Sequence, residues 1–178
     1  MTEHKSALEV IRSHQMAAPV DVHAIARNLG LRIRSLDLGE NVGGRIKRAW
    51  SGGYEVHVNE RDHPRRQRFT IAHEIAHFVM HRDLIGDGIT EDALFRGPWG
   101  DPHVETQANR LAADILMPYF LIQIYWLRAE RSVDQLARRF DVSKQAMEIR
   151  LEGFRRSAVS WPAGRMASDT GAAFPGLA

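Results

Sequence analysis

The sequence predicts an α+β fold, with a few short strands placed among several helices. Short segments between residues 31 and 58 alternate apolar and basic side chains, which is typical of strands with one wet face. Apolar residues at helical spacing precede and follow these segments. Ser132 and Ser143 each precede a short helical pattern, which predicts two capped helices near the end. The chain has 178 residues, 44% of them hydrophobic, and can therefore bury one core.

Composition narrows the class of protein. Charged residues make up 26% of the chain and the formal net charge is +2, so charge does not by itself indicate nucleic-acid binding. The chain has no cysteine, so any zinc site must use histidine and carboxylate ligands. Residues 1–6 lack the apolar core of a signal peptide, and no apolar run approaches the roughly 20 residues that span a bilayer. We therefore expect a cytoplasmic protein.

Two helices are predicted first. Residues 3–15 and residues 20–29 both carry apolar side chains at helical spacing. Asp21 is the predicted N-cap of the second helix, and Gly30 is expected to end it.

Three strands follow. Residues 31–36 form the first predicted strand. Residues 45–50 and 54–58 form two more, and the Ser-Gly-Gly sequence between them predicts a hairpin. The edge of the strand at 54–58 is a hypothetical place for an extended peptide to pair.

A long helix is predicted to begin at Pro64, and it carries the pattern His-Glu-x-x-His at residues 73–77. Four residues turn a helix by about 400°, so His73 and His77 lie on one face and can bind one zinc ion. Glu74 lies about 100° away, where a carboxylate can flank the metal without binding it. That is the place for a general base that takes a proton from water.

A catalytic zinc site usually takes a third protein ligand. His81 lies about 12 Å from His73 along the same axis, so we expect it to orient a ligand or to lie at the surface. Glu105 is the best candidate because it opens an alanine-rich helix, predicted over 104–117, that can pack closely on the histidine helix. Asn109, one turn later, is predicted to orient a ligand. The alternatives are first His103, then Asp101, Glu91 and Asp114.

The second half is predicted to be mostly helical. Residues 83–102 are rich in Gly and Pro and predict a long loop, either a functional lid or a disordered segment. A helix is expected over 119–130. Residues 132–140 and 144–151 then form two short helices that are similar to a helix-turn-helix. Residues 157–178 are expected to be a disordered tail.

Residues 68–77 (Arg-Phe-Thr-Ile-Ala-His-Glu-Ile-Ala-His) and 105–118 (Glu-Thr-Gln-Ala-Asn-Arg-Leu-Ala-Ala-Asp-Ile-Leu-Met-Pro) closely resemble the ImmA/IrrE family of zinc metallopeptidases. The resemblance implies a zincin-like core, in which a small sheet packs on the metal-binding helix. It implies that His73, His77 and Glu105 bind one Zn²⁺ per chain and that Glu74 is the general base.

The same resemblance implies a substrate. Members of the family cut cytoplasmic Xre-type helix-turn-helix repressors at specific sites and so derepress stress or mobile-element genes. We therefore divide the chain into a metallopeptidase domain at 1–130, a helix-turn-helix-like segment at 131–156 and the tail. The donor that stabilises the oxyanion stays open among Tyr54, His57, His103, Tyr119 and Arg110.

An alternative is a metal-sensing regulator that binds DNA or a repressor without peptidase turnover. Arg138, Arg139 and Lys144 give the segment at 131–156 some positive charge. Its apolar residues, however, are typical of core packing. We therefore favour a protein partner over direct binding of nucleic acid.

Overall fold

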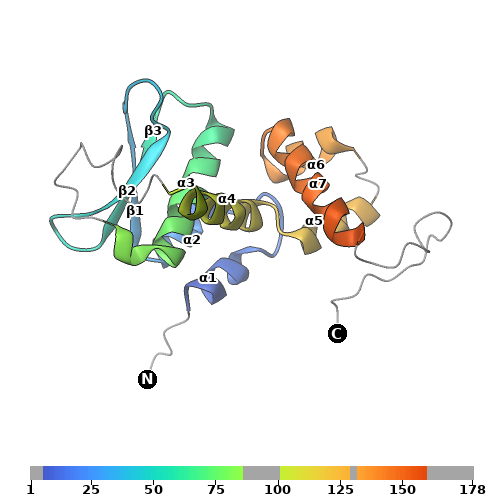
Figure 1. Cartoon of the computed structure of the whole chain (residues 1–178), viewed down its shortest axis with the longest axis horizontal. Coiled ribbons are helices and arrows are strands. Elements are labelled where there is room, and N and C mark those ends of the chain that lie inside the picture. Colours follow the sequence, from blue (N-terminus) through green and yellow to red (C-terminus); the bar gives the residue numbers. More distant parts are fainter. Residues whose placement is uncertain (1–5, 86–100, 129–131, 160–178) are drawn as a thin grey trace.

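The computed structural model describes residues 6–85, 101–128 and 132–159, with side chains up to residue 153. Figure 1 shows a small sheet with α2 and α3 at one end of the molecule and α5, α6 and α7 at the other, with α4 between them. The predicted α+β class is confirmed by this arrangement. Among the described residues, no helix is long and apolar enough to cross a membrane.

The two N-terminal helices are both set by side-chain caps. Helix α1 (Ala7–His14) begins after Ser6, whose hydroxyl accepts from the backbone N–H of Glu9 while the Glu9 carboxylate accepts from the N–H of Ser6. Helix α2 (Val22–Asn28) begins after Asp21, which accepts from the backbone N–H of Ala24. The predicted cap at Asp21 is thus confirmed.

The sheet has the order β1-β3-β2, with β1 (Leu31–Leu36), β2 (Gly44–Arg48) and β3 (Tyr54–Asn59). The predicted hairpin is confirmed, because β2 and β3 pair antiparallel. On its other edge, β3 pairs parallel with β1. The hypothesis that a peptide pairs with β3 is wrong, since β3 is the central strand and both its edges are taken. The last four residues of β3 are buried on both faces, as a central strand requires.

Helix α3 (Pro64–Met80) lies directly against β2. Its N-cap is His63, and Pro64 occupies the first turn, as predicted. A Cβ added to Gly44 of β2 would lie 2.4 Å from Cγ2 of Thr70 and 2.6 Å from the carbonyl oxygen of His57. Only glycine fits this contact, so it fixes the distance between β2 and the helix that carries the histidines.

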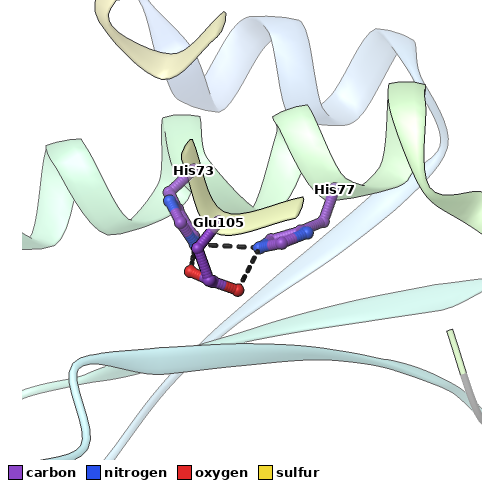
Figure 2. Close-up of side chains that lie close together, drawn as sticks. All are labelled: His73, His77 and Glu105. Carbon is purple, nitrogen blue, oxygen red and sulfur yellow. Dashed lines mark hydrogen bonds and ion pairs between the residues drawn. The ribbon is translucent and has the colours of Figure 1, made fainter. Parts of the chain in front are cut away.

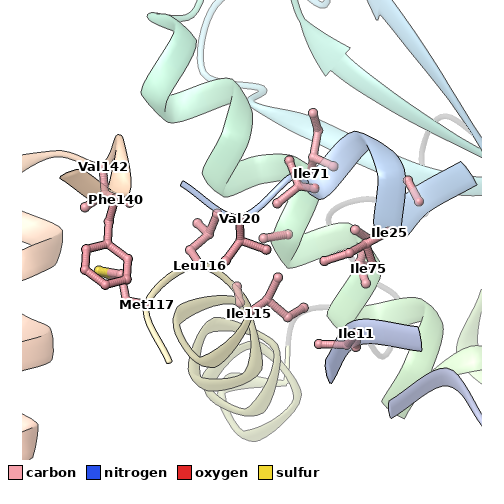
Figure 3. Packing of buried hydrophobic residues seen from close by; sticks show 14 of the residues in the cluster. Ile11, Val20, Ile25, Ile71, Ile75, Ile115, Leu116, Met117, Phe140 and Val142 are labelled. Atoms are coloured by element: carbon pink, nitrogen blue, oxygen red, sulfur yellow. The ribbon is translucent and has the colours of Figure 1, made fainter. Parts of the chain in front are cut away.

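Helix α4 (Pro102–Leu116) packs on α3 through small residues. Ala108 and Ala112 are fully buried, which lets the two backbones approach closely. Figure 3 shows the core that results, with Ile71 and Ile75 of α3 facing Ile115 of α4. The same cluster continues through other buried residues, among them Val20, Ile25, Leu116, Met117, Phe140 and Val142.

Three helices follow α4 in the part of the chain that the structure describes, namely α5 (Tyr119–Leu127), α6 (Val133–Phe140) and α7 (Lys144–Val159). Ser132 and Ser143 cap α6 and α7 as predicted, accepting from Gln135 and Ala146. Helix α7 extends three residues into the predicted tail. The remainder of that tail, and residues 86–100 of the predicted loop, lie outside the described residues.

Polar contacts also join these helices to the rest of the described structure. Asp141, in the left-handed conformation between α6 and α7, pairs with Arg65 and Arg68 of α3. Arg150 of α7 is 8% exposed and donates from Nε to the carbonyl oxygen of Met117 at 2.8 Å. Arg66 pairs with Asp62, so all three arginines at the start of α3 are paired with acids.

Candidate metal centre

Two histidines and one glutamate converge beside α3. Nε2 of His73 and Nε2 of His77 lie 2.9 Å apart. The two oxygens of Glu105 lie 3.3 Å from Nε2 of His73 and 3.4 Å from Nε2 of His77. Figure 2 shows both imidazoles leaving the same side of α3 to meet the carboxylate. All ligand atoms of this group lie within 4.8 Å of one another.

This donor set fits a zinc ion. Zinc binds histidine nitrogen and carboxylate oxygen at about 2.0–2.2 Å, so two ligands of a tetrahedral ion lie about 3.3 Å apart. The three separations in this group are close to that value. Two imidazoles and one carboxylate are also the protein ligands of several catalytic zinc sites, which leave a fourth position open.

The local structure explains why Glu105 reaches the histidines. Asp101 caps α4 by accepting from the backbone N–H of His103, so the helix begins there and Glu105 falls in its first turn. The other candidate ligands lie elsewhere. His103 is exposed and is not in the group, Asp114 pairs with Arg150 of α7, and Glu91 lies outside the described residues.

Burial keeps the two ligand histidines neutral. Burial and the neighbouring His73 and His81 lower the pKa of His77 to about 3. The pKa of His73 is also lowered, mainly by burial. A neutral imidazole has one nitrogen lone pair free for a metal, so both side chains can act as ligands near pH 7.

Glu74 is buried beside this group without belonging to it. Burial, and then the charge of Glu105, raise the pKa of Glu74 to about 8, while the backbone amide of Ile46 in β2 favours the charged form. A carboxyl group that titrates near neutral pH can both accept and release a proton there. The contact with Ile46 also shows that the free edge of β2 faces Glu74.

Each ligand histidine has a partner at its second nitrogen. Oδ1 of Asn109 lies 3.0 Å from Nδ1 of His73. Nδ1 of His81 lies 3.3 Å from Nδ1 of His77, and Nε2 of His81 lies 2.9 Å from Oε1 of Gln107. The sequence pointed to Asn109 and His81 but not to Gln107, because Gln107 lies about 200° from Glu105 on an isolated helix.

Both tyrosines among the predicted oxyanion donors contact an arginine. The hydroxyl of Tyr54 accepts from Nε of Arg82 at 3.3 Å. The ring of Tyr119 lies 3.5 Å below the guanidinium of Arg150. Neither contact identifies an oxyanion donor, so this role is left unassigned.

Comparisons with known proteins give a family. The sequence profile of the peptidase M78 family, described as the IrrE N-terminal-like domain, matches residues 26–152. The radiation response metalloprotease IrrE of Deinococcus deserti is 34% identical over 130 residues, which cover 69% of this chain and 43% of that protein. The protein of the same name from Deinococcus radiodurans is 38% identical over 91 residues, which cover 48% of this chain and 27% of that protein.

The chain thus spans less than half the length of either relative. Among solved structures, a Mycobacterium tuberculosis transcriptional regulator is similar with a TM-score of 0.57 and 19% identity. That match covers 82% of this chain and 46% of the regulator, and at this identity it shows the fold alone.

Proposed function

Because the chain belongs to the peptidase M78 family of IrrE N-terminal-like domains, we propose that it is a zinc-dependent endopeptidase. The observation that carries the proposal is the convergence of His73, His77 and Glu105 within 4.8 Å of one another. Zinc held by these three residues would act as a Lewis acid toward water and the scissile carbonyl group.

Glu74 is the proposed general base and acid. Its carboxylate accepts a proton from the attacking water and later gives that proton to the leaving amine. Its surroundings support this role, because Glu74 is buried beside the ligands and the backbone amide of Ile46 supports its charged form, which takes up the proton. Glu74 also lies on β2's side of the site, where a peptide paired with β2 would run.

We place the substrate peptide along the free edge of β2. Within residues 6–85, 101–128 and 132–159 this strand pairs only with β3, so its other edge can accept a further strand. The contact between Ile46 and Glu74 puts the middle of that edge beside the proposed base. Backbone pairing of this kind presents an extended peptide without demanding a particular side chain, so it favours an unfolded or loop segment of the substrate.

The proposed substrate is a helix-turn-helix repressor of the Xre type. The proposal rests on the similarity of residues 68–77 and 105–118 to the ImmA/IrrE family, and the name of both curated relatives, radiation response metalloprotease, agrees with a regulatory peptidase. Cleavage would remove the repressor from its promoter and so switch on stress or mobile-element genes.

The test is incubation of the zinc-loaded protein with a candidate repressor, followed by mass spectrometry of the products. The wild-type chain should cut at one site, and Glu74→Gln should keep its zinc but lose cleavage. If the wild-type chain binds the repressor or a promoter fragment and never cuts, it is instead a metal-sensing regulator. A regulator of that kind would bind its partner through the turn between α6 and α7, where Asp141 pairs with Arg65 of α3.

A further inference from the structure

We infer that His81 and Gln107 are positioning residues, which together fix the ring orientation and tautomer of His77. The inference rests on the proposed zinc site. Three side chains from two helices form a continuous line of polar contacts. Nδ1 of His77 lies 3.3 Å from Nδ1 of His81, and Nε2 of His81 lies 2.9 Å from Oε1 of Gln107.

The chemistry of the three groups allows only one placement of the protons. Nε2 of His77 faces His73 and Glu105, so a metal there requires its lone pair. The proton of a neutral His77 must then be on Nδ1, which donates to Nδ1 of His81. His81 consequently carries its own proton on Nε2, and that N–H donates to the amide oxygen of Gln107.

Exchanging donor and acceptor at any of these three side chains would break the series of hydrogen bonds. If Gln107 presented its amide N–H to His81, the proton of His81 would move to Nδ1. That N–H would then face the N–H of His77, and two donors would oppose each other at 3.3 Å. The amide oxygen of Gln107, when it faces His81, therefore favours the tautomer of His77 whose Nε2 lone pair is available to the metal.

The position of His81 is fixed by the end of α3. His81 is the C-cap residue, and its backbone N–H donates to the carbonyl oxygen of His77 at 2.8 Å. The residue is only 9% exposed, although an imidazole has two polar nitrogens. Both nitrogens are satisfied by the line described above, which accounts for a buried histidine that cannot itself reach the ion.

Helix α4 thus orients both ligand histidines. Asn109 accepts from Nδ1 of His73, and two residues earlier Gln107 acts on His77 through His81. The same helix supplies the third ligand, Glu105. We therefore expect that the docking of α4 on α3 builds the ligand set and sets both tautomers together.

The test compares zinc affinity among variants by competition with a chromophoric chelator. Gln107→Leu removes the acceptor from an exposed position, and His81→Phe keeps the ring but removes both nitrogens. Each should weaken zinc binding by roughly 10- to 100-fold. His81→Asn, whose amide oxygen can replace Nδ1, should recover most of the loss. Thr106→Val is the matched control on the same turn of α4 and should leave the zinc affinity unchanged.

Long-range ¹H–¹⁵N spectra of the zinc-loaded wild-type chain provide a readout that a merely structural role would not move. His77 should be protonated at Nδ1 and His81 at Nε2. A proton on Nδ1 of His81, or equal zinc affinity in Gln107→Leu and the wild-type chain, would overturn the inference and leave the peptidase intact. A wild-type chain that binds no zinc would instead contradict the proposed function, and the inference with it.

Discussion

Replacing Arg150 by alanine should weaken the attachment of α7 to the end of α4. The side chain donates to the carbonyl oxygen of Met117, pairs with Asp114 at 2.6 Å and lies 3.5 Å above the ring of Tyr119. Met117 is the C-cap of α4, and its carbonyl group has no hydrogen-bond donor within the helix. Arg150 is therefore the main polar link between α7 and the end of α4.

The magnitude follows from these three contacts. Leaving the buried carbonyl without a donor costs about 1–3 kcal/mol. The pair with the half-exposed Asp114 adds at most about 1 kcal/mol, and the stacking on Tyr119 adds about 0.5–2 kcal/mol. Because the contacts share one side chain, we expect a total loss of about 3 kcal/mol. For a chain of this length that corresponds to a fall in Tm of roughly 6–12 °C.

The assay is urea unfolding followed by circular dichroism, with Ile149→Ala as the control. Ile149 neighbours Arg150 on α7 but is 64% exposed, so its truncation should change the free energy of unfolding by less than about 0.5 kcal/mol. If Arg150→Ala costs less than about 1 kcal/mol, Arg150 does not hold α7 on α4 in the way described.

Three further predictions concern the sheet and the metal centre. Gly44→Ala should destabilise the fold by about 1–3 kcal/mol and reduce zinc affinity, because the new methyl group would clash with Thr70 and the backbone of β3. Thermal unfolding measures the first effect and chelator competition the second. An unchanged Tm and an unchanged zinc affinity would mean that β2 and α3 are farther apart. In the metal-free protein, burial raises the pKa of Glu74 to about 8, so the folded state alone holds this proton between pH 4.5 and 8 and stability falls as pH rises through that window. As pH rises through this window, the free energy of unfolding of Glu74→Gln should increase relative to that of the wild-type chain, by at most about 1.4 kcal/mol per pH unit. A difference that does not change with pH would contradict the burial of Glu74. The pKa of His77 is lowered to about 3, so the unfolded chain alone takes up its proton below pH 6.5; metal-free His77→Gln should lose less stability than the wild-type chain between pH 6.5 and 4, and equal losses would count against a buried neutral imidazole.

Local patterns in the sequence predicted most elements, because their causes are local. A side-chain cap at Asp21, a proline in the first turn at Pro64 and serine caps at Ser132 and Ser143 each act within four residues of themselves. The first helix was predicted to start four residues before Ala7, because the capping box at Ser6 was not recognised.

The order of the strands depends on contacts far apart in the chain, and that is where prediction failed. Nothing local distinguishes a hairpin whose second strand stays at the edge from one whose second strand lies between two others. The structure shows the difference through burial: Val56 and Val58 are buried on one face of β3, and His57 is buried on the other.

The candidate site shows the same division. The spacing of His73 and His77 is a property of one helix, and Glu105 could be proposed because it begins an alanine-rich one. The role of Gln107 depends on how α4 crosses α3 and on the place where α3 ends, which no spacing reveals. Arg150 is similar, since a buried arginine is understood only from the carbonyl oxygen that it reaches on another helix.

An anomalous difference map at the zinc absorption edge, from crystals of the protein purified without chelator, tests the central claim most directly. A single peak should lie within about 2.0–2.2 Å of Nε2 of His73, Nε2 of His77 and an oxygen of Glu105. A peak bound by other residues, or crystals with no peak while these three side chains point apart, would contradict the proposed metal centre and the peptidase built on it.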